Sequence, residues 1–174
     1  TARQIMTSAA IRNAMALDMA FGGSSNTVLH LTAIAHEAGA DVTLDDWSEV
    51  SARTPNLCRI SPASDYHMED LYEVGGIPTI MRELDKRGVL ERDAMTVSGK
   101  TAGEIAAGAR DTDGEIVRTI DNPYYPEGGL RVLRGNLAPD GAVVKQSAVP
   151  TDMRQHSGPA RVFDSEESAV EALF

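Results

Sequence analysis

A change of character at Asp111-Thr112-Asp113-Gly114 constrains this chain more than any other feature of its sequence. Upstream of this acidic segment the patterns are mostly helical, and downstream of it β-rich segments begin. An Asp-Gly pair between two kinds of pattern is typical of a turn or linker. We therefore predict a chain of the α/β class with two parts, residues 1–110 and residues 111–174.

The helices of the first part are predicted from residues that begin and end helices. Thr43 and Asp46 have the spacing of a capping box, while Gly22-Gly23 and Gly39 are suited to the left-handed residue that follows a helix. Pro55 ends the helix that precedes it. The predicted helices cover residues 6–21, 26–38, 44 to just before 55, 66–74 and 78–88, with a further helix after Thr101.

The second part is predicted to be rich in strands. Pro139-Asp140-Gly141 predicts a tight turn between two β-rich segments. The predicted strands cover residues 115–120, 130–134, 142–145 and 161–163, and Asp164-Ser165 begins a final helix. The sequence stops at Phe174 in the middle of that helical pattern, which leads us to expect a fragment of a longer protein.

The charge and hydropathy of the chain exclude two classes of partner. The formal net charge is −10 and the basic residues are scattered, so nucleic-acid binding is not expected. No apolar run reaches the roughly 18 residues needed to span a bilayer, and the first residues lack the pattern of a signal peptide. We expect a cytoplasmic protein without a membrane partner.

Cysteine and histidine do not predict a metal site in this chain. The single cysteine, Cys58, excludes an internal disulfide and any site built from several thiolates, and we interpret it as a small buried apolar residue. His67 and Asp70 are interpreted as the start of a surface helix, since acidic residues favour a first turn. His30 and His36 are six residues apart and therefore lie on different helix faces.

The sequence Phe21-Gly22-Gly23-Ser24-Ser25-Asn26-Thr27 is the one candidate binding motif that the residues themselves suggest. Two glycines and two hydroxyls precede a helix whose free backbone N–H groups can receive a carboxylate or phosphate. No lysine follows, so this is not a P-loop. The alternative is a tight connection in which one helix end is joined to the cap of the next.

Several short motifs, in this order, resemble those of the dihydroxy-acid dehydratase family. They are Ala16–Thr27, Ala63-Ser64-Asp65, Glu69-Asp70-Leu71 with Gly75-Gly76, Gly135–Gly141 and Gly158-Pro159-Ala160. Ser25 stands where the family more often has threonine, a change that keeps the hydroxyl. The resemblance implies the mostly helical end of an N-terminal α/β domain, followed by the start of a β-barrel-like swivelling β/β/α domain.

This resemblance also implies an activity and its cofactors. Family members are hydro-lyases that convert 2,3-dihydroxy acids to 2-oxo acids in branched-chain amino-acid synthesis, using an iron–sulfur cluster and Mg²⁺. The residues that bind these cofactors, and the catalytic serine, belong to family motifs outside this segment, so no catalytic or metal-binding residue is assigned here. Ser24, Ser25 and Asn26 are the expected substrate-binding residues, and a homodimer is expected for the full-length enzyme.

Two alternatives to this function remain open from the sequence. One is a fragment of a sugar-acid dehydratase, acting on an aldonate or phosphogluconate. The other is a truncated, non-catalytic module that binds a small anion. In every case the isolated chain is expected to be inactive and prone to aggregate or to be partly molten, because half-domains leave apolar surface uncovered.

Overall fold

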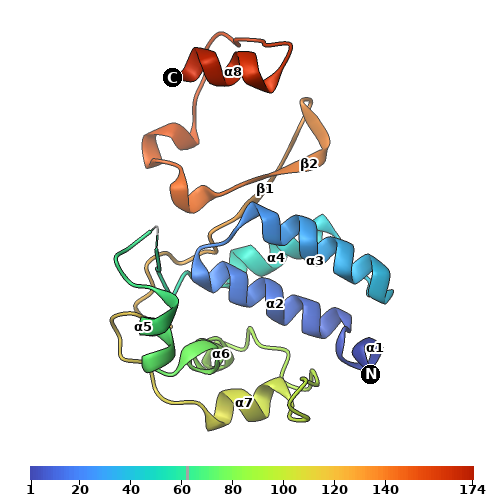
Figure 1. Ribbon diagram of the computed structural model, residues 1–174, viewed down its shortest axis with the longest axis vertical. Helices are drawn as coiled ribbons and strands as arrows, with labels where there is room; N and C mark the ends of the chain where they lie inside the picture. Colours follow the sequence, from blue (N-terminus) through green and yellow to red (C-terminus); the bar gives the residue numbers. More distant parts are fainter. Residues whose placement is uncertain (62) are drawn as a thin grey trace.

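The computed structural model describes residues 1–61 and 63–174, and Figure 1 shows the arrangement of its elements. Helices occupy the first part of the chain and a single antiparallel hairpin follows. The helices are α1 (Ala2–Ile5), α2 (Ser8–Phe21), α3 (Ser25–Ala38), α4 (Leu44–Arg53), α5 (Met68–Glu73), α6 (Gly76–Lys86), α7 (Ala102–Gly108) and α8 (Glu166–Leu173). The strands are β1 (Arg131–Gly135) and β2 (Ala138–Val144), and 3₁₀ turns cover Gln146–Ala148 and Thr151–Arg154.

Local capping explains where most of the helices begin and end. Gly22 and Gly39 follow α2 and α3 with φ angles of 100° and 70°, a left-handed conformation that glycine adopts without a steric penalty. The Asp46 carboxylate accepts a hydrogen bond of 2.8 Å from the Thr43 N–H, and the Thr43 hydroxyl accepts one from the Asp45 N–H. The predicted capping box at the start of α4 is confirmed.

Three helix boundaries differ from those predicted. The helix expected over residues 6–21 begins later, at Ser8, because the Thr7 hydroxyl accepts a hydrogen bond from the Ala10 N–H and caps α2. The helix expected over residues 66–74 is shorter, since His67 is the N-cap of α5. The helix expected from Pro78 begins earlier, at Gly76, because a proline is tolerated within the first turn.

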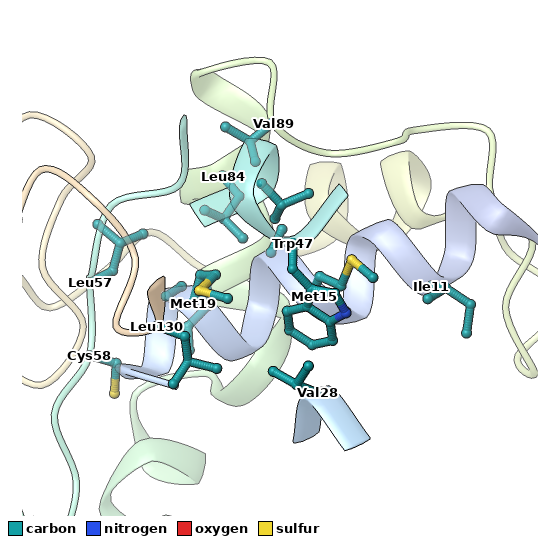
Figure 2. Packing of buried hydrophobic residues seen from close by; sticks show 14 of the residues in the cluster. Ile11, Met15, Met19, Val28, Trp47, Leu57, Cys58, Leu84, Val89 and Leu130 are labelled. Atoms are coloured by element: carbon teal, nitrogen blue, oxygen red, sulfur yellow. The ribbon is translucent and has the colours of Figure 1, made fainter. Parts of the chain in front are cut away.

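Helix α2 lies at the centre of the hydrophobic core. Its Met15 and Met19 are buried together with Trp47 of α4 and Leu84 of α6 (Figure 2). On the partly exposed side of the same helix, Arg12 forms a 2.9 Å ion pair with Asp46 of α4. Helix α2 is therefore held by its neighbours, and its C-terminal end is fixed in place.

Residues 115–130 return to this core, although they follow the predicted linker. Val117 and Leu130 are buried in the same hydrophobic cluster as α2. The buried carboxylate of Glu83 in α6 also accepts a 2.9 Å hydrogen bond from the Ile120 N–H. Residues 115–130 therefore contribute to the main core of the helical part, and we call residues 1–61 and 63–130 the body.

The strand predicted over residues 115–120 is wrong. Only Val117 makes a bridge, an isolated antiparallel contact with Cys58. The Asp113 carboxylate accepts hydrogen bonds from the N–H groups of Ile116 and Val117, at 3.0 and 3.1 Å. Because this side chain occupies the backbone donors, they are not available to a strand partner.

The tight turn predicted at Pro139-Asp140-Gly141 is also wrong. The chain reverses at Asn136-Leu137, and Pro139 to Gly141 lie within β2. Leu133 pairs with Ala142 whereas Gly135 pairs with Ala138, so β2 carries extra residues that form a bulge. Gly141, with a φ of 111°, gives the bulge the backbone conformation that it requires.

Residues 131–174 form what we call the arm, which extends from the body (Figure 1). Val132 and Val143 of the hairpin pack partly buried against the core, but no residue of the arm is fully buried. The strand predicted over residues 161–163 is wrong, since these residues have no regular structure. The final helix begins, as predicted, with Ser165 as its N-cap.

The structure supports the fold class only at a coarse level. Helices with one two-stranded antiparallel sheet are compatible with the predicted α/β class. The barrel-like second domain and the division at residue 110 stay predictions. Among the described residues, no helix has the length and apolar character that crossing a membrane would require.

Candidate functional site

A pocket of about 660 Å³ lies where the body meets the start of the arm. We call it the junction pocket. Its lining comes from the end of α2, the turn at Gly22-Gly23, which we call the glycine turn, the extended segment that begins at Asn56, and the first residues after β2. The described lining residues are Asp18, Phe21, Gly22, Gly23, Ser24, Asn56, Arg59, Ile60, Ser61, Ala63, Tyr125, Lys145, Ser147 and Ala148.

Three glycines, Gly22, Gly23 and Gly129, allow close backbone packing beside this pocket. A Cβ atom on Gly129 would lie 1.7 Å from the carbonyl oxygen of Gly22, so only glycine permits this close approach of two backbones. A Cβ on Gly23 would lie 2.5 Å from Cγ of Leu130. The Gly22 carbonyl also accepts a 3.0 Å hydrogen bond from the Ser147 hydroxyl. The glycine turn is therefore the point at which α2, residues 128–130 and the arm are joined.

The structure separates the three substrate-binding residues that the sequence predicted. Ser24 is the N-cap of α3 and lines the junction pocket. Ser25 and Asn26, in the first turn of α3, are exposed and are not among the lining residues. The Ser24 hydroxyl makes no capping hydrogen bond to the helix. The Ser24 hydroxyl is thus a polar group on the pocket wall that is not occupied in capping α3.

Asp18 was not singled out from the sequence, although it lies within the quoted motif. Its Oδ2 accepts a long hydrogen bond of 3.4 Å from the Ser24 N–H. Burial raises the pKa of Asp18, while the Thr27 hydroxyl, the Ser24 N–H and the charge of Lys145 act in the opposite direction. The favourable contacts of the ionised carboxylate therefore do not fully offset its loss of hydration. This carboxylate borders the pocket near Lys145.

Two basic side chains line the junction pocket although the chain is strongly acidic. Arg59 extends over two aromatic rings, with its guanidinium carbon 4.5 Å from the ring centre of Tyr124 and 5.1 Å from that of Tyr125. Lys145 is exposed and lies close enough to Asp18 to affect its pKa. Sequence reasoning missed both, because each is a single basic residue whose partners come from distant parts of the chain.

Asn56 fixes the backbone that carries Arg59. Its buried Nδ2 donates hydrogen bonds to the carbonyl oxygens of Ala20 and Cys58, at 3.0 and 3.2 Å. The N–H groups of Leu57 and Cys58 donate to the same Ala20 carbonyl oxygen. The extended segment is thereby tied to the end of α2, and Arg59 starts from a fixed position.

The described residues do not fit an iron–sulfur cluster or a magnesium ion. Residues 1–61 and 63–174 contain no group of three or more histidine, cysteine, aspartate or glutamate side chains that could hold a metal ion. Burial raises the pKa of Cys58 to about 12, which keeps its thiol protonated and unsuited to metal binding. Cys58 is buried in the core, which confirms the prediction that it is a small buried apolar residue.

The histidines have the places that the sequence predicted. His67 is the N-cap of α5, and its N–H donates a 2.7 Å hydrogen bond to the carboxylate of Asp70. The pair is therefore a helix start, as predicted. His30 and His36 are exposed on α3.

Comparison with known proteins identifies the family of the chain. The family model described as dihydroxy-acid/6-phosphogluconate dehydratase N-terminal matches residues 1–105, and the corresponding C-terminal model matches residues 115–174. These two matches together extend over nearly the whole sequence. The resemblance inferred from the short motifs is confirmed.

Individual relatives agree with the family models. A dihydroxy-acid dehydratase of Acetivibrio thermocellus is 55% identical over 170 residues, which are 98% of this chain and 31% of that protein. Those of Carboxydothermus hydrogenoformans and Aquifex aeolicus are each 57% identical over 171 residues, again 31% of the relative. The chain thus spans about a third of the length of these relatives. It belongs to the dihydroxy-acid/6-phosphogluconate dehydratase family.

Proposed function

We propose that this chain is a segment of a dihydroxy-acid dehydratase, a hydro-lyase of branched-chain amino-acid biosynthesis. The reaction removes the C2 proton and the C3 hydroxyl of a 2,3-dihydroxy-3-methyl acid as water, and the resulting enol tautomerises to a 2-oxo acid. The observation that carries the proposal is the 53–57% identity to proteins of that name over at least 98% of the chain.

The part of the enzyme that this chain supplies is the junction pocket. Ser24 places a hydroxyl on its wall, and Asp18 and Lys145 add opposite charges. These groups suit the polar end of a small hydroxy acid, whose hydroxyl groups both donate and accept hydrogen bonds. Ser25 and Asn26, which face solvent, have a smaller role than Ser24 in this proposal.

The cofactors of the complete enzyme are proposed to be an iron–sulfur cluster and Mg²⁺. Their ligands would come from other parts of the polypeptide, since the described residues gather no donor set of the required kind. When bound, such metals supply Lewis acidity that helps a hydroxyl group to leave.

The proposal extends to the surroundings of the arm. Leu137, Val162 and Leu173 of the arm are among its strongly exposed apolar side chains. Burial of these side chains against other parts of a complete enzyme would remove apolar surface from water. We propose that the arm begins the barrel-like β/β/α domain of the complete enzyme, and that the complete enzyme is a homodimer.

The test is an assay of the complete protein with 2,3-dihydroxyisovalerate, and with 6-phosphogluconate and an aldonate for comparison. We expect dehydration of the branched-chain acid with a kcat/KM at least about 100-fold above that for the sugar acids. A preference for a sugar acid would contradict the proposal and support the alternative family activity. Turnover of none of these acids by the cofactor-loaded protein would also overturn it.

Two matched serine variants test the place of the pocket in that reaction. We expect Ser24→Ala to lower kcat/KM about 10-fold, because it removes a hydroxyl from the pocket wall. Ser25→Ala, one residue further along the same helix start but exposed, is expected to stay within about twofold of the original enzyme. Equal effects of the two substitutions would remove Ser24 from the site.

A further inference from the structure

We infer that Arg59 binds the carboxylate of the acid in the junction pocket, with Lys145 as the second positive charge of this subsite. The inference rests on the proposed function, because it names the group that holds the proposed substrate. Arg59 carries a planar fork of N–H donors that matches the two oxygens of a carboxylate, whereas Lys145 supplies a flexible point charge.

Arg59 is held in place without using its hydrogen-bond donors. The two tyrosine rings beneath its guanidinium fix the side chain through cation–π contacts. Within residues 1–61 and 63–174, the structure records no salt bridge or side-chain hydrogen bond from Arg59. A guanidinium that is oriented by stacking and keeps its donors free is prepared for an anion that arrives from solution.

Among the residues that the structure describes, Arg59 and Lys145 combine a free charge with a place in the pocket wall. Arg12, Arg82 and Arg92 each form an ion pair with an aspartate, and they take part in the folding of the body. Lys145, like Arg59, has no ion pair within the described part of the chain, and both line the same pocket. Asp18 is the single acidic residue among the described lining residues, so two cations face one carboxylate and create a local preference for an anion.

The remaining wall indicates what kind of carboxylate fits. Phe21, Ile60 and Ala148 provide apolar surface, while Ser24 and Ser147 provide hydroxyls. A small acid with hydroxyl groups and a branched aliphatic end matches this mixture. A phosphorylated sugar acid would place a dianionic phosphate, in addition to its carboxylate, against the apolar side, where desolvation of the phosphate is costly.

The experiment is a calorimetric titration of the complete protein with 2-hydroxyisovalerate and with its neutral amide. The first probe keeps the carboxylate but lacks the 3-hydroxyl that would leave, so binding is measured without turnover. We expect Arg59→Met to weaken binding of the acid about 10- to 100-fold and binding of the amide less than about threefold. Arg59→Lys should fall between the original protein and Arg59→Met, because it keeps the charge and loses the fork.

Arg118→Met is the matched control. The Arg118 guanidinium also lies over the Tyr124 ring, at 4.0 Å, but Arg118 does not line the pocket. This variant loses the same charge and the same kind of stacking, and we expect it to bind the acid as the original protein does. An equal loss in both arginine variants would mean that overall charge is responsible, and it would overturn the inference.

Other outcomes are equally decisive. Unchanged acid binding in Arg59→Met would show that Arg59 does not contact the carboxylate. Equal weakening of acid and amide would assign Arg59 a structural role and also overturn the inference. If the original protein binds the acid through Arg59 but does not dehydrate 2,3-dihydroxyisovalerate, the inference stands and the proposed function fails.

Discussion

The body and the arm are built from similar local elements, but only the body buries its apolar side chains. Leu130, the last residue of the body, is 2% exposed, whereas Leu173 of α8 is 75% exposed. Helix α8 nevertheless has a capping serine, just as α2 has a capping threonine. Capping and turn residues therefore specify an element locally, while the stability of that element depends on what covers its apolar face.

The most disruptive test of this difference compares a glycine of the body with one of the arm. Gly129→Ala places a Cβ against the Gly22 backbone, so we expect a loss of more than about 3 kcal/mol of unfolding free energy. Gly135→Ala in the hairpin meets no atom within 4 Å and should change it by less than about 1 kcal/mol. Trp47, the single tryptophan and a core residue, reports the unfolding of the body in urea by its fluorescence.

A tolerated alanine at position 129 would show that the two backbones are not in close contact. The close packing of the glycine turn against residues 128–130 would then be contradicted.

A smaller effect is expected from leucine truncation in the two regions. Leu130→Ala removes a buried side chain that lies beyond the predicted linker, so we expect a loss of about 2–4 kcal/mol. Leu173→Ala should alter the urea transition of Trp47 by less than about 0.5 kcal/mol, because its side chain is exposed. If both substitutions had the same small effect, residues 115–130 would not belong to the core of the body.

The smallest expected change in unfolding free energy comes from removing an ion pair, and it depends on pH. Burial opposes ionisation of Asp46, but hydrogen bonds from Thr43 and Arg12 outweigh it and lower the pKa of this carboxyl. Its stabilising contribution is therefore present above the unfolded pKa, near 4, and is lost as the pH falls through the lower folded value. We expect Arg12→Met to cost about 1 kcal/mol at pH 7 and to reduce this acid dependence.

Arg134→Met provides the matched comparison in the arm. Arg134 pairs with Asp45 of α4 at 2.6 Å, but both side chains are exposed. The cost at pH 7 should be below about 0.5 kcal/mol and should fall further in salt. Urea titrations at pH 7 and pH 3.5 compare the two variants, and identical costs would contradict the larger contribution of the Arg12–Asp46 pair.

The helices were largely predictable, whereas only two of the four strands predicted in the second part form, those that correspond to β1 and β2. Capping residues such as Thr43 act over three or four positions, so the sequence carries the whole signal. The failure at residues 115–120 has a different origin. Val117 is β-prone, but the nearby Asp113 carboxylate takes the backbone donors that a strand would need.

The site was predictable only in part, for a related reason. The glycine turn and Ser24 are adjacent in sequence, and their local pattern indicated an anion site. Arg59 and Lys145 are brought to the same pocket by contacts between distant segments, such as the hydrogen bond from Ser147 to Gly22. No local pattern distinguishes them from other basic residues.

The measurement that tests the account most directly is hydrogen exchange of the complete protein with and without saturating 2-hydroxyisovalerate. We predict slower exchange in peptides that contain residues 18–24, the segment around Arg59, and Lys145 to Ala148, with no change in α7, which is outside the pocket. Protection in both the body and the start of the arm would place the acid in the junction pocket. Protection elsewhere, with these segments unchanged, would contradict the account.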